Sequence, residues 1–197
     1  DAMPRRACRL RSSRLPYDQT QFFEAHMPVK AVLAAARAEG VTLTSWLGAR
    51  LMLAVYAELP LLERRRPVAV SLPVNLRNYY PSETARNFFN SIRVGHQFTG
   101  AETPASLAAD FDAALKLELS EERVKARMDG FEQFEQLPFV KPVPLVIKNQ
   151  VVGAITRFQE RYSTATLSNL GVIKTPPELS PWLRGFAAMS STSNLFA

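Results

Sequence analysis

The alternation of apolar and polar residues between positions 68 and 76 constrains this 197-residue chain more than any other feature. Apolar side chains recur there at every second position, namely Val68, Val70, Leu72, Val74 and Leu76. A period of two residues is typical of a strand with one buried face. A polar loop containing Pro81 follows, and a second strand-like run begins at Phe88. We expect the strand at 68–76 to pair with a strand at 88–98.

Helical signals stand on both sides of these strands. Residues 29–59 hold two apolar helical stretches, separated by Gly40, which suits a helix end. Thr42 or Thr44 then suits the cap of the second helix, because a threonine hydroxyl can accept a bond from a backbone N–H group.

Further helices are expected after the second strand. Thr103 suits the cap of a helix over 104–116, another helix is expected after Ser120, and a third over 145–159. Strands are indicated near 165–172 and at 185–193. This order of elements favours an α/β fold in which helices pack on a mixed sheet.

Composition indicates a folded domain and argues against nucleic-acid binding. The chain is 47% hydrophobic and 21% charged, which is typical of a globular protein. Its net charge of +6 is uneven, because five arginines against one aspartate place +4 within the first fourteen residues. The rest carries +2, without the basic stripe that binding to phosphate backbones requires. We expect no nucleic-acid partner.

Several other classes of site are not expected. Cys8 is the single cysteine, so the chain cannot form an internal disulfide, and a cytoplasmic location is expected. Charged residues interrupt the apolar stretches, so no membrane span is expected. No metal site is expected either, because His26 and His96 are isolated in the sequence. No carboxylate partner for His96 can be assigned from the sequence.

Three stretches together resemble the second lobe of the chloramphenicol acetyltransferase-like superfamily. That superfamily holds alcohol acetyltransferases, polyketide-associated acyltransferases and the condensation domains of peptide synthetases. Residues 73–90 match its pattern of a strand, an arginine, a proline-containing loop and a Gly/Asn-Phe-x-Asn strand, while 29–59 and 165–172 resemble two further parts of the lobe. The resemblance implies an acyltransferase lobe, a mixed β-sheet packed with helices, over 17–197, and residues 1–16 resemble the crossover linker that precedes it.

The departure from the family is the missing catalytic motif. These enzymes carry His-His-x-x-x-Asp-Gly in the first lobe, where one histidine is the general base, and no such motif occurs here. The sequence also begins without Met and without the apolar core of a signal peptide. We therefore expect roughly the second half of an enzyme, whose partner is the N-terminal lobe of the same protein, and which is inactive alone.

The resemblance also implies roles for particular residues. Ser168, with Asn169 as the alternative, would donate a hydrogen bond to the oxyanion formed during acyl transfer. Both residues also suit an ordinary turn before Gly171. Arg77 and Asn87 would lie near the entrance for the donor, although Arg77 also suits an anchor for the loop that follows it. Asn90 is a further binding candidate, or a core amide with satisfied hydrogen bonds.

The function implied is transfer of an acyl group from a thioester to a hydroxyl, as in alcohol acetyltransferases. Acyl-CoA or a carrier-protein thioester would be the cosubstrate, an alcohol or amine the acceptor, and no tightly bound cofactor is expected. A fragment of a peptide-synthetase condensation domain is one alternative. A non-catalytic interaction module that retains the fold is another.

Overall fold

The computed structural model describes residues 5–10, 16, 19, 21–84, 88–136, 143–173, 175–183 and 185–186; at 131–136, 156 and 157 this description covers the backbone only. Most of the expected strand at 185–193 lies outside these residues. Gly185 and Phe186, which are described, are not in a strand.

Three strands form one small mixed sheet. β1 (Val68–Asn75) lies between β2 (Phe89–His96) and β3 (Ala165–Thr166). β1 and β2 are antiparallel, with Val68 opposite His96 and Asn75 opposite Phe89, whereas β1 and β3 are parallel. The predicted pairing of the first two strands is confirmed, and the fold is mixed α/β with its sheet packed against helices.

The third strand is shorter than the sequence indicates, because β1 contains Pro73. The N–H of Ala69 points toward the third strand, where it donates to Thr164 Oγ1 at 3.2 Å. Strand periodicity turns the nitrogen of residue 73 the same way. Pro73 has no N–H group to donate, so the ladder with β3 ends after Leu167 N–H donates to the Ser71 carbonyl at 2.9 Å.

Five α-helices complete the described part of the chain: α1 (Val29–Ala38), α2 (Leu43–Glu58), α3 (Pro104–Glu118), α4 (Glu121–Gln136) and α5 (Leu145–Glu160). Three helix ends have predicted capping residues, and of the two threonines suited to cap α2 it is Thr42 that does so. Gly40 has a φ of +72°, and Thr42 Oγ1 accepts from the Ser45 N–H at 3.2 Å to begin α2. Thr103 and Ser106 form a capping box at the start of α3.

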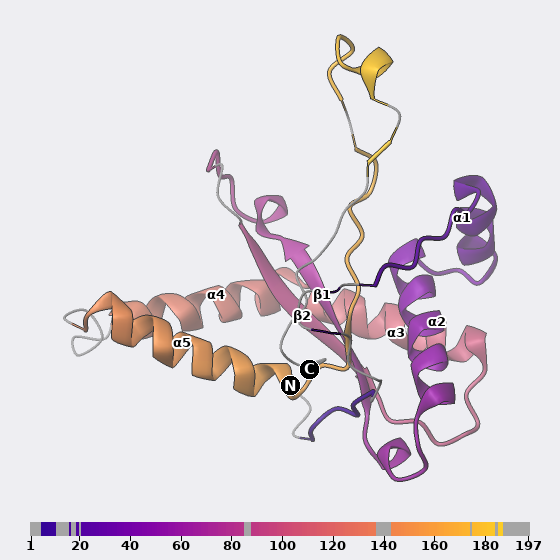
Figure 1. Ribbon diagram of the computed structural model, residues 1–197, viewed down its shortest axis with the longest axis horizontal. Helices are drawn as coiled ribbons and strands as arrows, with labels where there is room; N and C mark the ends of the chain where they lie inside the picture. Colours follow the sequence, from indigo (N-terminus) through magenta and orange to yellow (C-terminus); the bar gives the residue numbers. More distant parts are fainter. Residues whose placement is uncertain are drawn as a thin grey trace.

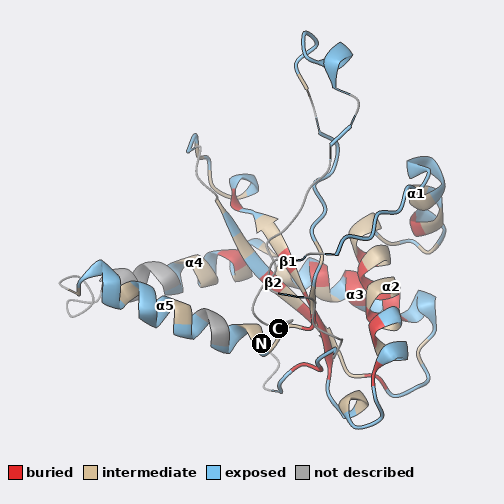
Figure 2. Cartoon of the chain, viewed as in Figure 1, coloured by how far each residue is buried: buried red, intermediate tan, exposed pale blue. Residues whose placement is uncertain are grey.

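The core lies between one face of the sheet and the helices α2 and α3. Figure 2 shows the buried residues gathered where these elements meet. The face of β1 that bears Val68, Val70 and Leu72 is buried, as its alternation predicts, together with Ile92 and Val94 of β2. Against it pack Ala49, Met52, Val55, Leu107, Ala108, Phe111 and Leu115.

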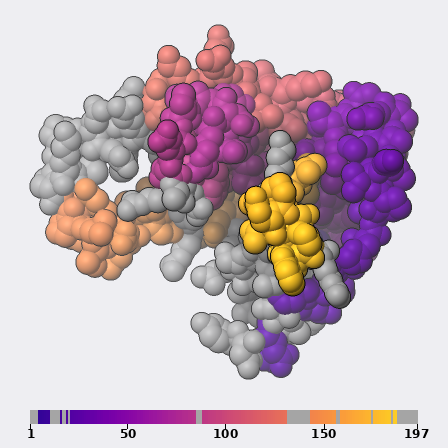
Figure 3. Space-filling model, turned by 90° about the horizontal axis from the view of Figure 1, so that it is seen from above, coloured from indigo at the N-terminus to yellow at the C-terminus, as the bar shows by residue number. Residues whose placement is uncertain are grey.

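Helices α4 and α5 lie side by side and extend away from this core (Figure 1). Seen from above, the described residues of α5 stand at the edge of the molecule (Figure 3). Much of the α5 surface is apolar and exposed to solvent, with large side chains at Leu145, Val146, Ile147, Val151, Val152, Ile155 and Phe158.

Candidate functional site

Four of the five predicted site residues that the sequence singled out lie at or beyond one end of the sheet. We call this the exit end; it is marked by Asn75, the last residue of β1, and Asn90 near the start of β2. Because β3 runs parallel to β1, the segment after Thr166 leaves the sheet at this end too (Figure 1). The fifth predicted residue, Asn87, lies outside the described residues.

Arg77 is held within the loop that follows β1. Asn75 Oδ1 accepts from the backbone N–H of Arg77 at 3.1 Å and so begins a short helical turn over Leu76–Asn78. The Arg77 guanidinium donates to the Thr84 carbonyl at 2.7 Å and lies 5.9 Å from the Phe88 ring centre. These contacts fit the loop-anchoring alternative. A role for Arg77 in binding the donor stays a prediction.

Asn90 is half-buried rather than enclosed in the core. It lies opposite Val74, and its Oδ1 accepts from the N–H of Ser91 at 2.8 Å. The amide oxygen of Asn90 is therefore used in a bond to the next residue of β2. A role for Asn90 as a ligand stays a prediction as well.

Ser168 and Asn169 lie on the exposed segment after β3. Asn169 Nδ2 donates to Thr44 Oγ1 at 3.1 Å, and Asn169 Oδ1 accepts from the Gly171 N–H at 2.9 Å. Gly171 has a φ of +65°, so the predicted turn is present. The Ser168 hydroxyl has no hydrogen-bond partner among the described residues. Asn169 thus fixes this segment to the start of α2 and leaves the adjacent hydroxyl available.

The start of α2 is itself fixed by a buried carboxylate that sequence reasoning missed. Asp112 of α3 accepts from Ser45 Oγ at 2.7 Å and from the Thr42 N–H at 3.2 Å, and pairs with Lys116 at 2.6 Å. Burial alone would raise the pKa of Asp112, but hydrogen bonds from Lys116, Ser45 and Thr42 lower it to about 2. The signal in the sequence was an aspartate inside the apolar stripe of a helix, with a lysine four residues later.

A histidine–carboxylate pair lies at the opposite end of the sheet. His96 Nε2 and Glu102 Oε1 are 3.4 Å apart, and the His96 ring meets Phe98 edge-on with 5.0 Å between ring centres. Backbone and side-chain hydrogen bonds from Thr99 lower the pKa of Glu102 to about 2. Since His96 pairs with Val68 at the beginning of β1, this pair is remote from the exit end.

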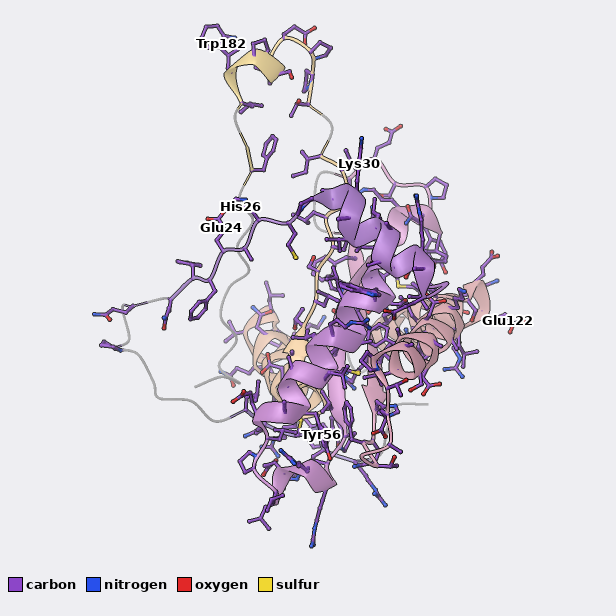
Figure 4. The ribbon with its side chains drawn as sticks, turned by 90° about the vertical axis from the view of Figure 1, so that its right-hand side faces the viewer. Glu24, His26, Lys30, Tyr56, Glu122 and Trp182 are labelled. Atoms are coloured by element: carbon purple, nitrogen blue, oxygen red, sulfur yellow. The ribbon has the colours of Figure 1, made fainter. Side chains whose placement is uncertain are left out.

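The other histidine, His26, belongs to neither the sheet nor a helix. It lies 3.4 Å from Glu24 on the exposed segment before α1, and Figure 4 shows both side chains on that segment, well apart from Tyr56 at the far end of α2. Among the described residues, no hydrogen bond or ion pair joins either histidine to Ser168.

The described residues hold neither a group of metal-ligating side chains nor a helix that could span a membrane. Within the ranges given above, no cluster of three or more His, Cys, Asp or Glu side chains has the arrangement of a metal site. None of the helices described is both long enough and apolar enough to cross a bilayer. Cys8 is buried and its Sγ lies 3.2 Å from Thr164 Oγ1; burial raises the pKa of this thiol.

Comparison with known proteins gives one structural similarity. No protein-family model and no curated protein matches the chain. The structure of polyketide synthase associated protein 5 from Mycobacterium tuberculosis aligns with 54% of this chain and 31% of that chain, at 18% identity and a TM-score of 0.38. The chain therefore spans less than a third of that protein's length in the alignment. Similarity at this level establishes neither a shared fold nor a shared function.

Proposed function

We propose that the chain is the second lobe of a thioester-dependent O-acyltransferase of the alcohol acetyltransferase kind. The observation that carries the proposal is the meeting of two family-like segments at one end of the sheet. The described residues of the 73–90 stretch and the segment at 168–171 are far apart in sequence, yet both lie at the exit end, and Asn169 bonds the second segment to Thr44 at the start of α2.

The proposed chemistry divides the work between two lobes. A histidine of the N-terminal lobe removes the proton from the acceptor hydroxyl, and the oxygen then attacks the thioester carbonyl. The tetrahedral intermediate collapses to the ester and expels the thiolate, which takes up a proton. Negative charge on the carbonyl oxygen requires a donor that is already in position.

Ser168 is the proposed donor to that oxyanion. Three features support this role: its hydroxyl is exposed, it has no partner among the described residues, and it adjoins Asn169, whose amide is held by Thr44 and Gly171. A donor on a segment that is fixed beforehand costs little reorganisation during the reaction. Asn169 uses both ends of its own amide in these bonds, which favours Ser168 over Asn169.

The test is acyl transfer by the parent protein that carries both lobes. Ester formation from acetyl-CoA is measured with a panel of alcohols, and Ser168→Ala is expected to lower kcat by roughly tenfold to a thousandfold, since one oxyanion donor is lost. Ser180→Ala, which removes another exposed serine hydroxyl, serves as the matched control and leaves kcat unchanged.

Three results would count against the assignment. A normally folded Ser168→Ala protein with unchanged kcat would leave Ser168 only its place in the turn. Transfer from a carrier-protein thioester, with none from acetyl-CoA, would favour the condensation-domain alternative. Absence of any transfer from either donor by the parent protein would favour a non-catalytic interaction module.

A further inference from the structure

The connection between α2 and β1 holds two adjacent leucines in solvent. Leu61 and Leu62 are 78% and 80% exposed, whereas Leu59, directly after α2, is buried. Residues 60–66, which we call the α2–β1 turn, lie at the lower extremity of the molecule in Figure 1. Two leucines exposed to this extent gain free energy wherever an apolar phase covers them.

The α2–β1 turn has a fixed shape that places a cation beside these leucines. Arg64 Nε donates to the Leu59 carbonyl at 3.0 Å, so this side chain folds back on the end of α2. Leu62 has helical φ and ψ angles and leads into a 3₁₀ helix over Glu63–Arg65. Side chains three residues apart align in such a helix, so Leu62 and Arg65 share one face.

Arginines from two distant parts of the sequence gather here. The N–H of Arg9 donates to Glu63 Oε2 at 3.4 Å, and the N–H of Cys8 donates to the Pro67 carbonyl at 2.9 Å. Residues 5–10 therefore lie alongside the α2–β1 turn.

The two segments together carry a strong positive charge. Six arginines against two glutamates leave +4 over residues 5–10 and 58–66, namely Arg5, Arg6, Arg9, Arg64, Arg65 and Arg66 against Glu58 and Glu63. Glu63 pairs with Arg66, whereas Arg65 is exposed and forms no ion pair within the described part of the chain. Leu10, which follows Arg9, adds a third apolar side chain and is 39% exposed.

We propose that the α2–β1 turn and residues 5–10 dock on the surface of an anionic lipid bilayer. The leucines enter the boundary between headgroups and acyl chains, and the guanidiniums meet the negative charge of the lipid headgroups. A nucleic acid would bind the arginines but leave Leu61 and Leu62 in water. A bilayer surface matches both the charge and the apolar side chains, which favours a lipid partner.

The docking surface is separate from the proposed acyl-transfer site. The α2–β1 turn precedes β1, whereas the exit end lies where β1 finishes at Asn75. A bilayer bound at the turn therefore leaves the exit end open, and the proposal does not depend on acyl transfer.

Vesicle binding by the 197-residue chain tests the proposal. Flotation with phosphatidylcholine vesicles, with or without phosphatidylserine as about a third of the lipid, gives the partition coefficient. We expect tighter binding to the anionic vesicles, which weakens as salt is raised. Leu61→Ser together with Leu62→Ser should lower the partition coefficient at least about tenfold, since two apolar side chains are lost. Arg65→Gln should lower it about fivefold, the effect of one charge near the membrane.

Two matched controls separate this surface from the rest of the molecule. Leu145→Ser together with Val146→Ser removes two side chains of α5 that are 71% and 69% exposed. Arg37→Gln removes the charge of an exposed arginine on α1. Both controls should bind the anionic vesicles as the unmodified chain does.

A polarity-sensitive dye on Leu62→Cys reports insertion directly. Cys8 is buried, so a thiol-reactive dye labels the introduced cysteine. Its emission should shift to shorter wavelength on binding to anionic vesicles, whereas the emission of a dye on Leu145→Cys should not.

Three outcomes would overturn the proposal: equal binding to neutral and anionic vesicles, no shift from the dye on Leu62→Cys, or equal losses from the leucine change and its α5 control. Binding of double-stranded DNA without binding of vesicles would instead assign the arginines to a nucleic acid. All of these results stand whether or not the parent protein transfers acyl groups.

Discussion

Asp112 joins two helices through one carboxylate. It lies in the apolar stripe of α3, yet both of its oxygens have partners, because Ser45 and Thr42 donate to one and Lys116 to the other. A buried carboxylate is tolerated only with such partners. Asp112 therefore fixes the start of α2, the helix that carries Thr44 to the segment containing Ser168.

Replacing Asp112 by asparagine is expected to destabilise the fold in a pH-dependent manner. The folded pKa is about 2, whereas an unfolded aspartate has a pKa of about 3.9. The stabilisation is therefore complete above pH 4 and is lost as pH falls toward 2. Urea unfolding at pH 7 should show a loss on the order of 2 kcal/mol for Asp112→Asn, and the difference from the unmodified chain should narrow by pH 3.

Asp110→Asn is the control for this change. It alters an exposed aspartate on the same helix and should change the free energy of unfolding by less than about 0.5 kcal/mol. A deficit for Asp112→Asn that stayed the same from pH 7 to pH 2 would assign the effect to packing instead of to the ionised carboxylate.

Helices α2 and α3 approach closely because α2 has a glycine at the contact. A Cβ atom on Gly48 would lie 2.6 Å from Cε2 of Phe111 and 2.8 Å from Cε1. Phe111 is fully buried in the core and is surrounded by other elements. The ring therefore has little room to move, and Gly48 lets it pack directly on the α2 backbone.

Gly48→Ala should consequently destabilise the chain by about 1–3 kcal/mol, the usual cost of overpacking. Gly153→Ala in α5 is the matched control. No atom of the described residues lies within 4 Å of its added methyl group, so the better helix propensity of alanine should stabilise α5 by up to about 1 kcal/mol. Thermal unfolding measures both changes. Similar effects of the two substitutions would show that the Phe111 contact does not limit the approach of α2 and α3.

Periodicity and capping residues predicted the positions of the elements well, but they predicted the contacts between elements less well. The alternation at 68–76 and the threonines at 42 and 103 located β1, α2 and α3, since these signals act within a few residues. The length of β3 was not predictable in the same way, because Pro73 limits it from a neighbouring strand.

The candidate sites required the tertiary structure for the same reason. Glu102 is close to His96 in sequence, but a turn brings their side chains together, and Thr99 holds the carboxylate in that turn. The resemblance did name Ser168 and Asn169, and the bond from Asn169 to Thr44 became visible only in the folded chain.

At the scale of the whole molecule, large apolar side chains are exposed over much of the described surface. Two projections contribute, namely the α4–α5 pair and the segment that carries Trp182, which Figure 4 shows at the tip of an extended arm. Large apolar side chains that gather on one exposed helix, as on α5, are typical of an interaction site, and a second lobe would need such a site to meet the first.

The isolated chain should therefore bind a hydrophobic dye such as ANS and associate at high concentration. Val151→Lys together with Ile155→Lys places two charges on the exposed face of α5. These changes should reduce dye fluorescence and association, measured by sedimentation velocity, while changing stability by less than about 0.5 kcal/mol per site. Leu61→Lys, at an exposed leucine remote from α5, is the control. Equal dye binding by the unmodified chain, the double variant and Leu61→Lys would show that α5 is not the surface that binds the dye.

The short segment around Ala7 and Cys8 links parts of the fold that are distant in sequence. The N–H of Ala7 donates to the Arg161 carbonyl at 3.1 Å, and the N–H of Cys8 donates to the Pro67 carbonyl at 2.9 Å. Thr164 Oγ1 donates to the Cys8 carbonyl at 3.0 Å. Peeling residues 7 and 8 away from the fold would therefore require all three of these bonds to break. The segment therefore connects the residue after α5 with the residue before β1, and its removal should loosen both.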